Sequence, residues 1–333
     1  MARLVKRLVK NVLYAYLEED VYYGSKRSVL SIYLGPFEEF SSYDVNCTEA
    51  KTKLLAKLLE NCSSGTKLYK SQYLSESGLL YLEYVRVILR QFNLTNSIDE
   101  IKSYSDAFYT RYAQGTTAIE GNTCTLRETD LILNEGVSVG GKDLREIHEI
   151  ENYKKLRSYV DSYSGDLTEE FILKINSIIL DNLDVPKGSY RKVAVVIRGA
   201  DFEPPPAAVV PDEMVSLLSW YKKVDLHPLE TAVLFHQKFE EIHPFAEGNG
   251  RTGREILNFI LRKNGFPPIF FGTPEREEYL SALDSGNKEN FIPLFKFILW
   301  RVLEAGKSYK KHVTIDIEGF DSRKISAIGV KDN

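Results

Sequence analysis

The strongest constraint on the fold of this chain is a helical periodicity that recurs through most of its length. Apolar residues repeat at steps of three and four, which places them on one face of a helix. This spacing is found over residues 79–92, 101–112, 147–160, 171–179 and 291–302. A helix with one apolar face must bury that face against another element, so the pattern predicts a mainly α-helical bundle.

The N-terminal residues are patterned differently. Two runs of β-branched and aromatic residues, at 12–17 and 29–34, flank a polar stretch that contains a glycine. This arrangement predicts a β-hairpin that Gly35-Pro36 ends. The basic stretch before it is predicted to form a charged first strand or a helix. A small α+β region is therefore expected before the helical bundle.

One helix is predicted to follow this hairpin. Thr48 begins it. Its apolar face consists of Leu54, Leu55, Leu58 and Leu59. Residues 61–65 are polar and are predicted to break the helix before the bundle begins.

Composition and charge exclude several classes of protein. The 333 residues include 43 Lys and Arg against 47 Asp and Glu, a net charge of −4, so the chain is not built around a nucleic-acid footprint. Cys47, Cys62 and Cys124 are scattered and form no CxxC pair, which argues against a disulfide framework or a zinc site. No apolar run approaches the ~20 residues of a membrane span. These features predict a cytoplasmic protein with no clear nucleic-acid or membrane partner.

One strand-like segment interrupts the helical pattern. Residues 190–199 are rich in β-branched side chains, Ala200-Asp201 can form a turn, and three prolines follow at 204–206. The sequence predicts a short β-hairpin with a second strand that the prolines stiffen. An isolated hairpin has at least one unpaired edge, and that edge could accept a guest strand.

The stretch that carries chemistry is the turn between two apolar helices, from Ile242 to Arg254. Gly248 and Gly250 lead into a helix N-terminus, where free N–H groups and the helix dipole favour an anion. Arg251 and Arg254 lie three residues apart, near one face of the first helical turn. Two guanidiniums beside such a turn indicate a polyphosphate ligand.

Two further side chains of this turn suit phosphate chemistry. Glu247 is a carboxylate placed to hold a Mg²⁺ ion that bridges phosphates. His243 closes the preceding helix and is a candidate general base. Each feature alone is usually structural, but their occurrence together within a dozen residues favours a joint site.

Residues 243–254, HPFAEGNGRTGR, resemble the Fic-domain signature HPFx[DE]GNGRxxR at every fixed position. Residues 188–191 and the predicted hairpin resemble the GxYR segment and the target-docking flap of that family. Residues 276–287 resemble its nucleotide-base pocket. The resemblance covers roughly residues 100–305.

The resemblance implies a helical Fic bundle with a short β-hairpin flap, and the transfer of AMP from ATP to a Ser, Thr or Tyr hydroxyl of a target protein. By motif position, His243 would deprotonate the hydroxyl, Glu247 would hold Mg²⁺, and Arg254 would hold the γ-phosphate so that pyrophosphate leaves. The other implied nucleotide contacts are Gly248, Asn249, Gly250, Arg251, Thr252, Gly253, Tyr279, Asn287 and the flap residues Ile197, Arg198 and Gly199. Relatives that transfer a phosphate instead carry lysine at the position of Gly250.

A second motif lies upstream. Residues 116–122 match the inhibitory pattern of the family, [ST]xxxE[GN]. Thr116 and Glu120 are one helical turn apart on a shared face, and Gly121 can end the helix. The resemblance implies that Glu120 inhibits the enzyme. The alternative is a solvated glutamate near a helix end.

The chain is therefore predicted to comprise an N-terminal region over residues 1–95, an inhibitory-helix segment over 96–140, a Fic core over 141–305 and a tail over 306–333. Four functions stay open: AMP transfer held in check by Glu120, the same chemistry with another nucleotide, removal of AMP from a modified protein, and a regulatory module that binds nucleotide without turnover. The expected partners are ATP and a target protein that docks on the flap. Homodimer formation is a further hypothesis.

Overall fold

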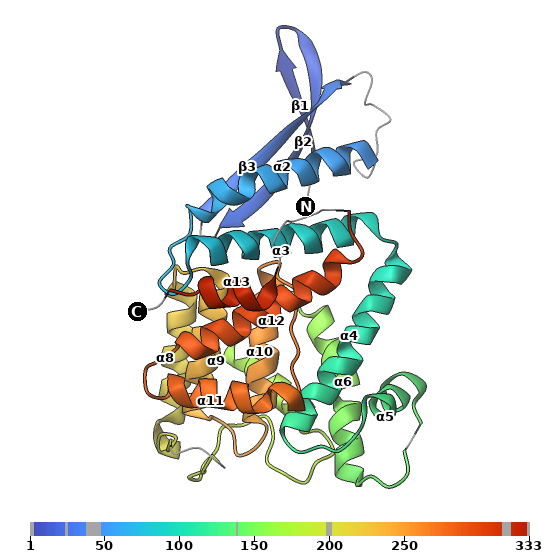
Figure 1. Ribbon diagram of the computed structural model, residues 1–333. Coiled ribbons are helices and arrows are strands. Elements are labelled where there is room, and N and C mark those ends of the chain that lie inside the picture. Colours follow the sequence, from blue (N-terminus) through green and yellow to red (C-terminus); the bar gives the residue numbers. More distant parts are fainter. Residues whose placement is uncertain are drawn as a thin grey trace.

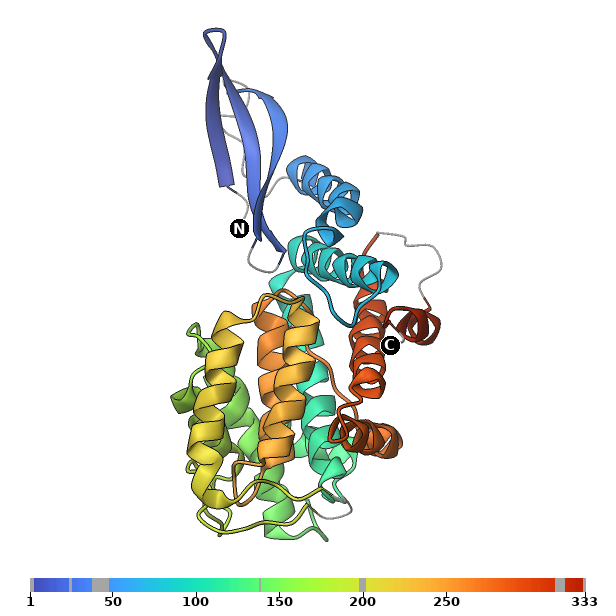
Figure 2. The ribbon, with the colours of Figure 1, turned by 90° about the vertical axis from the view of Figure 1, so that its left-hand side faces the viewer.

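The computed structural model describes residues 3–23, 26–37, 48–137, 139–197, 202–314 and 321–331 of the chain. A small sheet and one helix stand above a helical body in Figure 1, and Figure 2 shows the same arrangement from the side. The predicted fold class, a mainly α-helical bundle preceded by an α+β region, is confirmed.

The N-terminal sheet is antiparallel and has the strand order β1 (Arg3–Val9), β2 (Val12–Tyr23) and β3 (Lys26–Pro36). The predicted hairpin is confirmed as β2 and β3, and the basic segment before it is a strand rather than a helix. Alternate side chains of these strands share one face. On that face Ala15, Leu17, Ile32 and Leu34 pack against Ala50 and Leu54 of the next helix. The sheet therefore has a small core of its own.

The helix that covers this core, α2 (Thr48–Thr66), continues through residues 61–65, so the predicted polar break is wrong. Cys62 is buried there against apolar side chains of α2 and of the following helix. Gly65 lies so close to Tyr23 that an added Cβ would be 2.2 Å from the tyrosine ring. Packing on both sides outweighs the weak helix propensity of this stretch.

The helical body holds the predicted stripes on buried faces. Its elements are α3 (Glu76–Thr95), α4 (Ile98–Ile119), α5 (Leu126–Asp130), the π-helical η1 (Leu131–Glu135), α6 (Leu144–Ser162), α7 (Glu169–Ile179), the 3₁₀ turn η2 (Ala207–Val209), α8 (Val210–Lys223), α9 (Pro228–Ile242), α10 (Asn249–Lys263), the 3₁₀ turn η3 (Thr273–Glu275), α11 (Arg276–Gly286), α12 (Ile292–Lys310) and α13 (Ser322–Ile328). One apolar core runs through α4, α6, α7, α9, α10, α11 and α12. The helices α9 and α10 pack on each other, and the turn between them lies near α4 and α11.

Side chains define the ends of several of these helices. Thr125 and Glu128 form a capping box at the start of α5, as the sequence predicts. A second capping box, formed by Ser97 and Glu100, begins α4. The left-handed Gly121 follows the end of α4, with φ 106°. The length of α4 is therefore fixed at both ends, which places residue 120 at its C-terminus.

The segment predicted as a flap hairpin has a different local structure. Its described residues, 190–197 and 202–206, form no strand, and residues 198–201 lie outside the described part of the chain. The guanidinium of Arg191 donates to the carbonyls of Val193 and Pro205, at 3.2 and 2.5 Å, so these acceptors bond a side chain instead of a partner strand. The three prolines also lack the N–H groups that a ladder needs.

The C-terminal segment packs on the body. The helix α13 lies against α3 and α12 (Figure 1), and Leu74 forms an isolated β-bridge with Val330. Cys62 and Cys124 are free and buried, whereas Cys47 lies outside the described residues. Across the described ranges, no helix is long and apolar enough to cross a bilayer.

Candidate active site

Two helices and the turn between them form the centre of the site. The helix α9 ends at His243, whose N–H donates to the carbonyl of Phe239 at 3.0 Å. The backbone of His243 is left-handed, with φ 48°, which is uncommon for a residue other than glycine. Gly248, with φ 80°, then begins α10. These two left-handed residues reverse the chain within six positions and bring the histidine ring beside the N-terminus of α10.

Hydrogen bonds fix the backbone of this turn. The Asn249 amide accepts from the N–H of Phe245 and donates to its carbonyl, both at 2.8 Å. Arg191 donates from its side chain to the carbonyl of His243 at 2.8 Å and from its N–H to the carbonyl of Pro244 at 2.9 Å. Because the Asn249 side chain is hydrogen-bonded to the backbone of Phe245, this residue could contact a phosphate only through its own backbone N–H.

Arg254 extends from α10 to the C-terminal turn of α4. Its Nε donates to Thr116 Oγ1 at 2.7 Å, and its Nη2 donates to the Thr116 carbonyl at 3.0 Å and to Glu120 Oε1 at 2.6 Å. The one-turn spacing of Thr116 and Glu120 thus brings both to the same guanidinium. Burial alone would raise the pKa of the Glu120 carboxyl, but the charge of Arg254 holds it below its usual value. The pair is therefore ionised at neutral pH.

Glu120 also stands over the first turn of α10. A Cβ added at Gly250 would lie 2.6 Å from Glu120 Oε1 and 2.8 Å from Arg254 Nη1. Real Cβ atoms do not approach other atoms this closely, so only glycine fits while Glu120 is in place. The carboxylate occupies the space beside the helix N-terminus, where an anion is favoured.

A cluster of ion pairs lies at the outer side of the turn. Glu247 Oε1 accepts from Arg145 and, at 3.3 Å, from Arg251 Nη2. The Arg251 side chain is buried and also lies 3.2 Å from a carboxylate oxygen of Glu149. Arg251 is therefore not part of a solvated face, and it balances two carboxylates.

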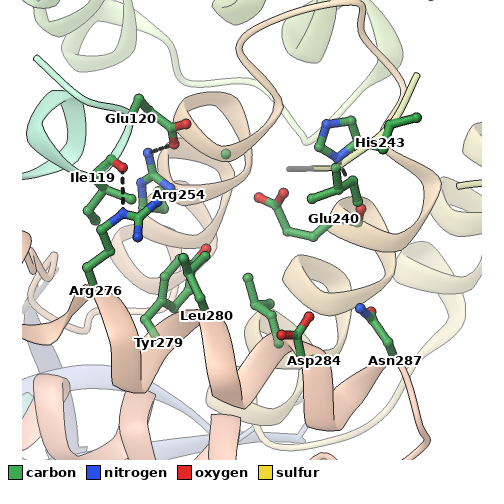
Figure 3. Close-up of a pocket in the computed structure, with 14 residues that line it drawn as sticks. Ile119, Glu120, Glu240, His243, Arg254, Arg276, Tyr279, Leu280, Asp284 and Asn287 are labelled. Atoms are coloured by element: carbon green, nitrogen blue, oxygen red, sulfur yellow. Dashed lines mark hydrogen bonds and ion pairs between the residues drawn. The ribbon is translucent and has the colours of Figure 1, made fainter. Parts of the chain in front are cut away.

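Glu120, His243, Gly250 and Arg254 line a cavity of about 340 Å³. It joins the ends of α4 and α9, the first turn of α10 and one face of α11 (Figure 3). The lining residues from these elements and the flap segment are Ile119, Glu120, Val196, Ile197, Glu240, His243, Gly250, Arg254, Arg276, Tyr279, Leu280, Leu283, Asp284 and Asn287. An anion-binding end at Gly250 and Arg254 is therefore continuous with a mixed end formed by α11.

The electrostatics of His243 follow from its burial and its neighbour. Burial lowers the pKa of the imidazole to about 4, so the ring is neutral at physiological pH. Its Nδ1 lies 3.4 Å from the carbonyl oxygen of Glu240, which can only accept a hydrogen bond. This contact favours the tautomer with the proton on Nδ1, and it leaves a lone pair on Nε2.

Sequence reasoning missed Glu240 among the lining residues, whereas Arg276 and Asp284 fall within the segment 276–287 that resembles a base pocket. The Glu240 carboxyl projects toward the cavity from α9, and its buried Oε1 has no hydrogen-bond partner within the described residues (Figure 3). Burial raises its pKa to about 8, Arg254 opposes this shift, and Glu120 adds to it. The carboxyl is therefore protonated at neutral pH. Its position, three residues before His243 on the same helix, is the signal that could have revealed it.

The predicted base-pocket residues both reach the cavity. The Tyr279 hydroxyl lies 2.7 Å from His236 Nε2, and its ring packs against that histidine. Asn287 accepts a hydrogen bond from Gln237 Nε2 at 2.9 Å. Ile197 of the flap segment also lines the cavity.

Other predicted contacts do not line it. Thr252 is fully buried, 3.4 Å from the amide of Asn176, and Gly253 packs beside Glu240. Arg198 and Gly199 lie outside the described residues. The structure therefore brings together the anion-binding turn, the histidine and the inhibitory motif, but it directs the middle of the signature into the core.

The fold and the cavity define a class: a helical protein with an anion-binding turn between two central helices and a histidine at its edge. Residues 166–261, which include the turn and His243, match the model of the Fic/DOC family.

The relatives agree with this match. The chain is 33% identical over 198 residues to the protein adenylyltransferase Fic of Nematostella vectensis, which covers 57% of this chain and 46% of the relative. It is 29% identical over 226 residues to the protein adenylyltransferase fic-1 of Caenorhabditis elegans, which covers 65% of this chain and 44% of the relative. The chain therefore spans less than half the length of these relatives.

Solved structures show the same fold. A Fic domain containing signaling protein from Bacteroides thetaiotaomicron superposes with a TM-score of 0.62 at 24% identity, over 72% of this chain and 100% of that chain. A Fic family protein from Desulfovibrio desulfuricans superposes with a TM-score of 0.61 at 25% identity, over 74% of this chain and 79% of that chain. The helical body described above is therefore the fold of these proteins.

Proposed function

We propose that this chain transfers AMP from ATP to a Ser, Thr or Tyr hydroxyl of a target protein and releases pyrophosphate. The observation that carries the proposal is the convergence of His243, Arg254 and the first turn of α10 on one cavity. The names of the curated relatives, which are protein adenylyltransferases, support it.

In the proposed reaction, Nε2 of His243 takes the proton of the target hydroxyl while the hydroxyl oxygen attacks the α-phosphorus. The bond between that phosphorus and the oxygen bridging to the β-phosphate breaks, and pyrophosphate leaves with the bridging oxygen. The low pKa of His243 suits this role, since the ring is a neutral base at pH 7. The N–H groups of the first turn of α10 and the Arg254 guanidinium would bind the phosphates.

Glu247 is the proposed ligand of a Mg²⁺ ion. Mg²⁺ usually binds one or two carboxylates together with phosphate oxygens and waters. The Glu247 side chain is partly exposed at the outer side of the turn, and in the described part of the chain no three His, Cys, Asp or Glu side chains are grouped as metal ligands. A single carboxylate beside a phosphate site fits this requirement. When bound, the ion would neutralise part of the phosphate charge.

Glu120 is proposed to inhibit this reaction. It occupies the guanidinium of Arg254, which is the residue proposed to hold the γ-phosphate. It also fills the space beside Gly250. ATP that enters while Glu120 stays in place would bind with its α-phosphate displaced from His243, and a displacement of ~1 Å can cost on the order of 10² in rate.

The target is proposed to dock on the flap segment. Val193 and Val196 are exposed there, and Val196 and Ile197 also line the cavity. A target backbone that pairs with this extended segment would place its hydroxyl near His243 with little side-chain selectivity. Homodimer formation and a cytoplasmic location stay predictions.

The decisive experiment is mass spectrometry of the Glu120→Gly variant and a lysate after incubation with Mg²⁺ and isotopically labelled nucleotides. We expect AMP attached to a hydroxyl residue, and no label on protein when only the γ-phosphate of ATP is labelled. Label from another nucleotide would show that the chain uses that nucleotide instead of ATP. Loss of AMP from a modified protein would show that the chain removes AMP. ATP that is retained but unreacted would identify a binding module and contradict the proposal.

A further inference from the structure

The hairpin formed by β1 and the first half of β2 projects away from the helical body (Figures 1 and 2). Its tip is the turn at Lys10 and Asn11, which both have positive φ. Behind the turn, Leu8, Val9, Val12 and Leu13 are 69, 44, 42 and 36% exposed. These four residues and the turn are called the hairpin tip here. Such a group of exposed aliphatic side chains marks a surface that contacts something apolar.

The strand register places these side chains on both faces of the ribbon. Leu8 stands opposite Leu13, and Val9 stands opposite Val12. Opposite residues share a face and successive residues alternate, so one face carries the leucines and the other carries the valines. A folded protein partner usually covers one face of a strand pair. A tip that is apolar on both faces suits a medium that surrounds it on all sides.

Charge identifies that medium. No Asp or Glu occurs before Glu18, whereas Lys6, Arg7 and Lys10 lie on or just behind the hairpin tip. Arg7 bonds Glu18, and the Lys6 ammonium lies 3.9 Å from the centre of the Phe37 ring. The side chains of Lys6, Arg7 and Lys10 are all exposed. An apolar tip followed by exposed cations matches the order of a lipid surface, in which acyl chains lie beneath anionic headgroups.

We propose that the hairpin tip binds the surface of an anionic membrane. Two residues of each strand extend ~7 Å behind the turn, which agrees with the ~5–10 Å depth of apolar groups that insert at the headgroup boundary. Lys6 and Arg7 then lie level with the headgroups. The helix α11, which lines the cavity, is at the opposite end of the molecule from the tip (Figure 1). An anchored molecule therefore holds its cavity away from the lipid and open to solvent.

The test is sedimentation of the full chain with vesicles of phosphatidylcholine alone or mixed with phosphatidylserine. We expect binding to the mixed vesicles that falls with added salt, and much weaker binding to neutral ones. Val12→Asp places a charge in the tip and should lower the affinity for mixed vesicles about tenfold or more. Lys10→Glu changes only the turn and should lower it as well. The matched control is Val215→Asp, because Val215 is 56% exposed on α8, and this change should have no effect.

Three results would overturn the proposal. The first is binding to mixed vesicles that neither Val12→Asp nor Lys10→Glu reduces, or no binding at all. The second is a dimer in light scattering that Val12→Asp dissociates, which would assign the tip to a second copy of the chain. The third is tighter binding to a DNA or RNA duplex than to vesicles, again lost in both variants. The AMP transfer rate of Val12→Asp in solution should equal that of the wild type, so failure here is separable from failure of the proposed function.

Discussion

The N-terminal sheet and the cavity both join arginines to carboxylates, and they do so under opposite conditions. On the sheet, Arg3 and Arg7 reach Glu18 with guanidinium groups whose side chains are 45% and 47% exposed. In the cavity, the Arg254 side chain is only 4% exposed, and it meets Glu120, whose side chain is 36% exposed. Water and salt screen the sheet pairs, so their net contribution to stability is small. The Arg254 guanidinium is desolvated, and removing Glu120 leaves this buried charge without its carboxylate partner.

This difference teaches which charges can take part in function. A charge in a screened pair can lose its partner to water at little cost in free energy, so it does not require a ligand as a replacement partner. The Arg254 side chain is buried, so the loss of its anionic partner costs more free energy than on the sheet. Under the proposed function, a nucleotide would compete with Glu120 for Arg254 because it supplies another anion. Burial in the cavity also lowers the pKa of His243 and raises the pKa of Glu240.

The largest expected effect tests the cavity through its base. His243→Ala should lower AMP transfer by a factor of ~10² to 10⁴, because the target hydroxyl then has no proton acceptor. Initial rates of labelling in the Glu120→Gly background measure it, and ATP binding should change little. His236→Ala, which alters another buried histidine of α9, is the matched control for packing. Undiminished labelling by His243→Ala would remove the histidine from the mechanism.

A second prediction breaks the buried pair. Glu120→Gly should raise the initial rate of labelling on the order of 10²-fold, since it frees Arg254 and the space beside Gly250 for phosphates. The matched control is Glu135→Gly, which changes an exposed glutamate of η1 and should leave the rate as it is. The double variant Glu120→Gly/His243→Ala should be inactive. A rate for Glu120→Gly at or below the wild-type rate would show that Glu120 does not inhibit.

A third prediction concerns pH and Glu240. Because the pKa of the Glu240 carboxyl is raised from its ordinary value to about 8, this group keeps its proton at neutral pH in the folded state. The contribution of the bound proton to folding stability is lost as the pH rises through 8. Between pH 7 and 9 the carboxyl gains a negative charge that faces Arg254 and Glu120 and repels phosphates. ATP affinity of the wild-type protein should therefore fall about tenfold over this range, by like-charge repulsion.

Calorimetric titration with ATP at each pH measures this effect. Adding Glu240→Gln should remove the dependence, because the amide keeps the shape of the carboxylic acid without its titration. Glu241→Gln changes the adjacent glutamate, which pairs with Lys238, and should keep the dependence of its parent. The same slope in the Glu240→Gln variant would place the titrating group elsewhere.

The smallest expected effect tests the sheet. Glu18→Gln removes the negative charge that pairs with two exposed arginines and should shift the melting temperature by less than about 3 °C. Scanning calorimetry at low and high salt measures it, and the shift should be smaller at high salt. A large shift that salt does not reduce would mean that the sheet pairs resemble the buried pair after all.

Local patterns explain what the sequence predicts well. The stripes of α4, α6, α7 and α12 and the Thr125–Glu128 capping box depend on neighbours within one or two helical turns, so they can be recognised without the fold. The signature turn is similar, because the preference for an anion at Gly248 and the first residues of α10 depends on their own backbone.

The remaining features depend on distant contacts. Residues 61–65 stay helical because Tyr23 packs on Gly65, forty-two positions later in the chain. The flap segment forms no ladder among its described residues because Arg191 bonds its carbonyls. Glu240 faces the cavity only because α4 and α11 close around α9. None of these arrangements leaves a periodic signal in the sequence.

Gly250 links the choice of chemistry to the presence of the inhibitor. Any side chain at this position would enter the space that Glu120 Oε1 holds, 2.6 Å from the new Cβ. A lineage that replaced this glycine, for instance with the lysine that distinguishes phosphate-transferring relatives, would therefore have to lose or reposition the glutamate. A side chain at position 250 and the glutamate at position 120 would compete for the same space, so the two positions are coupled.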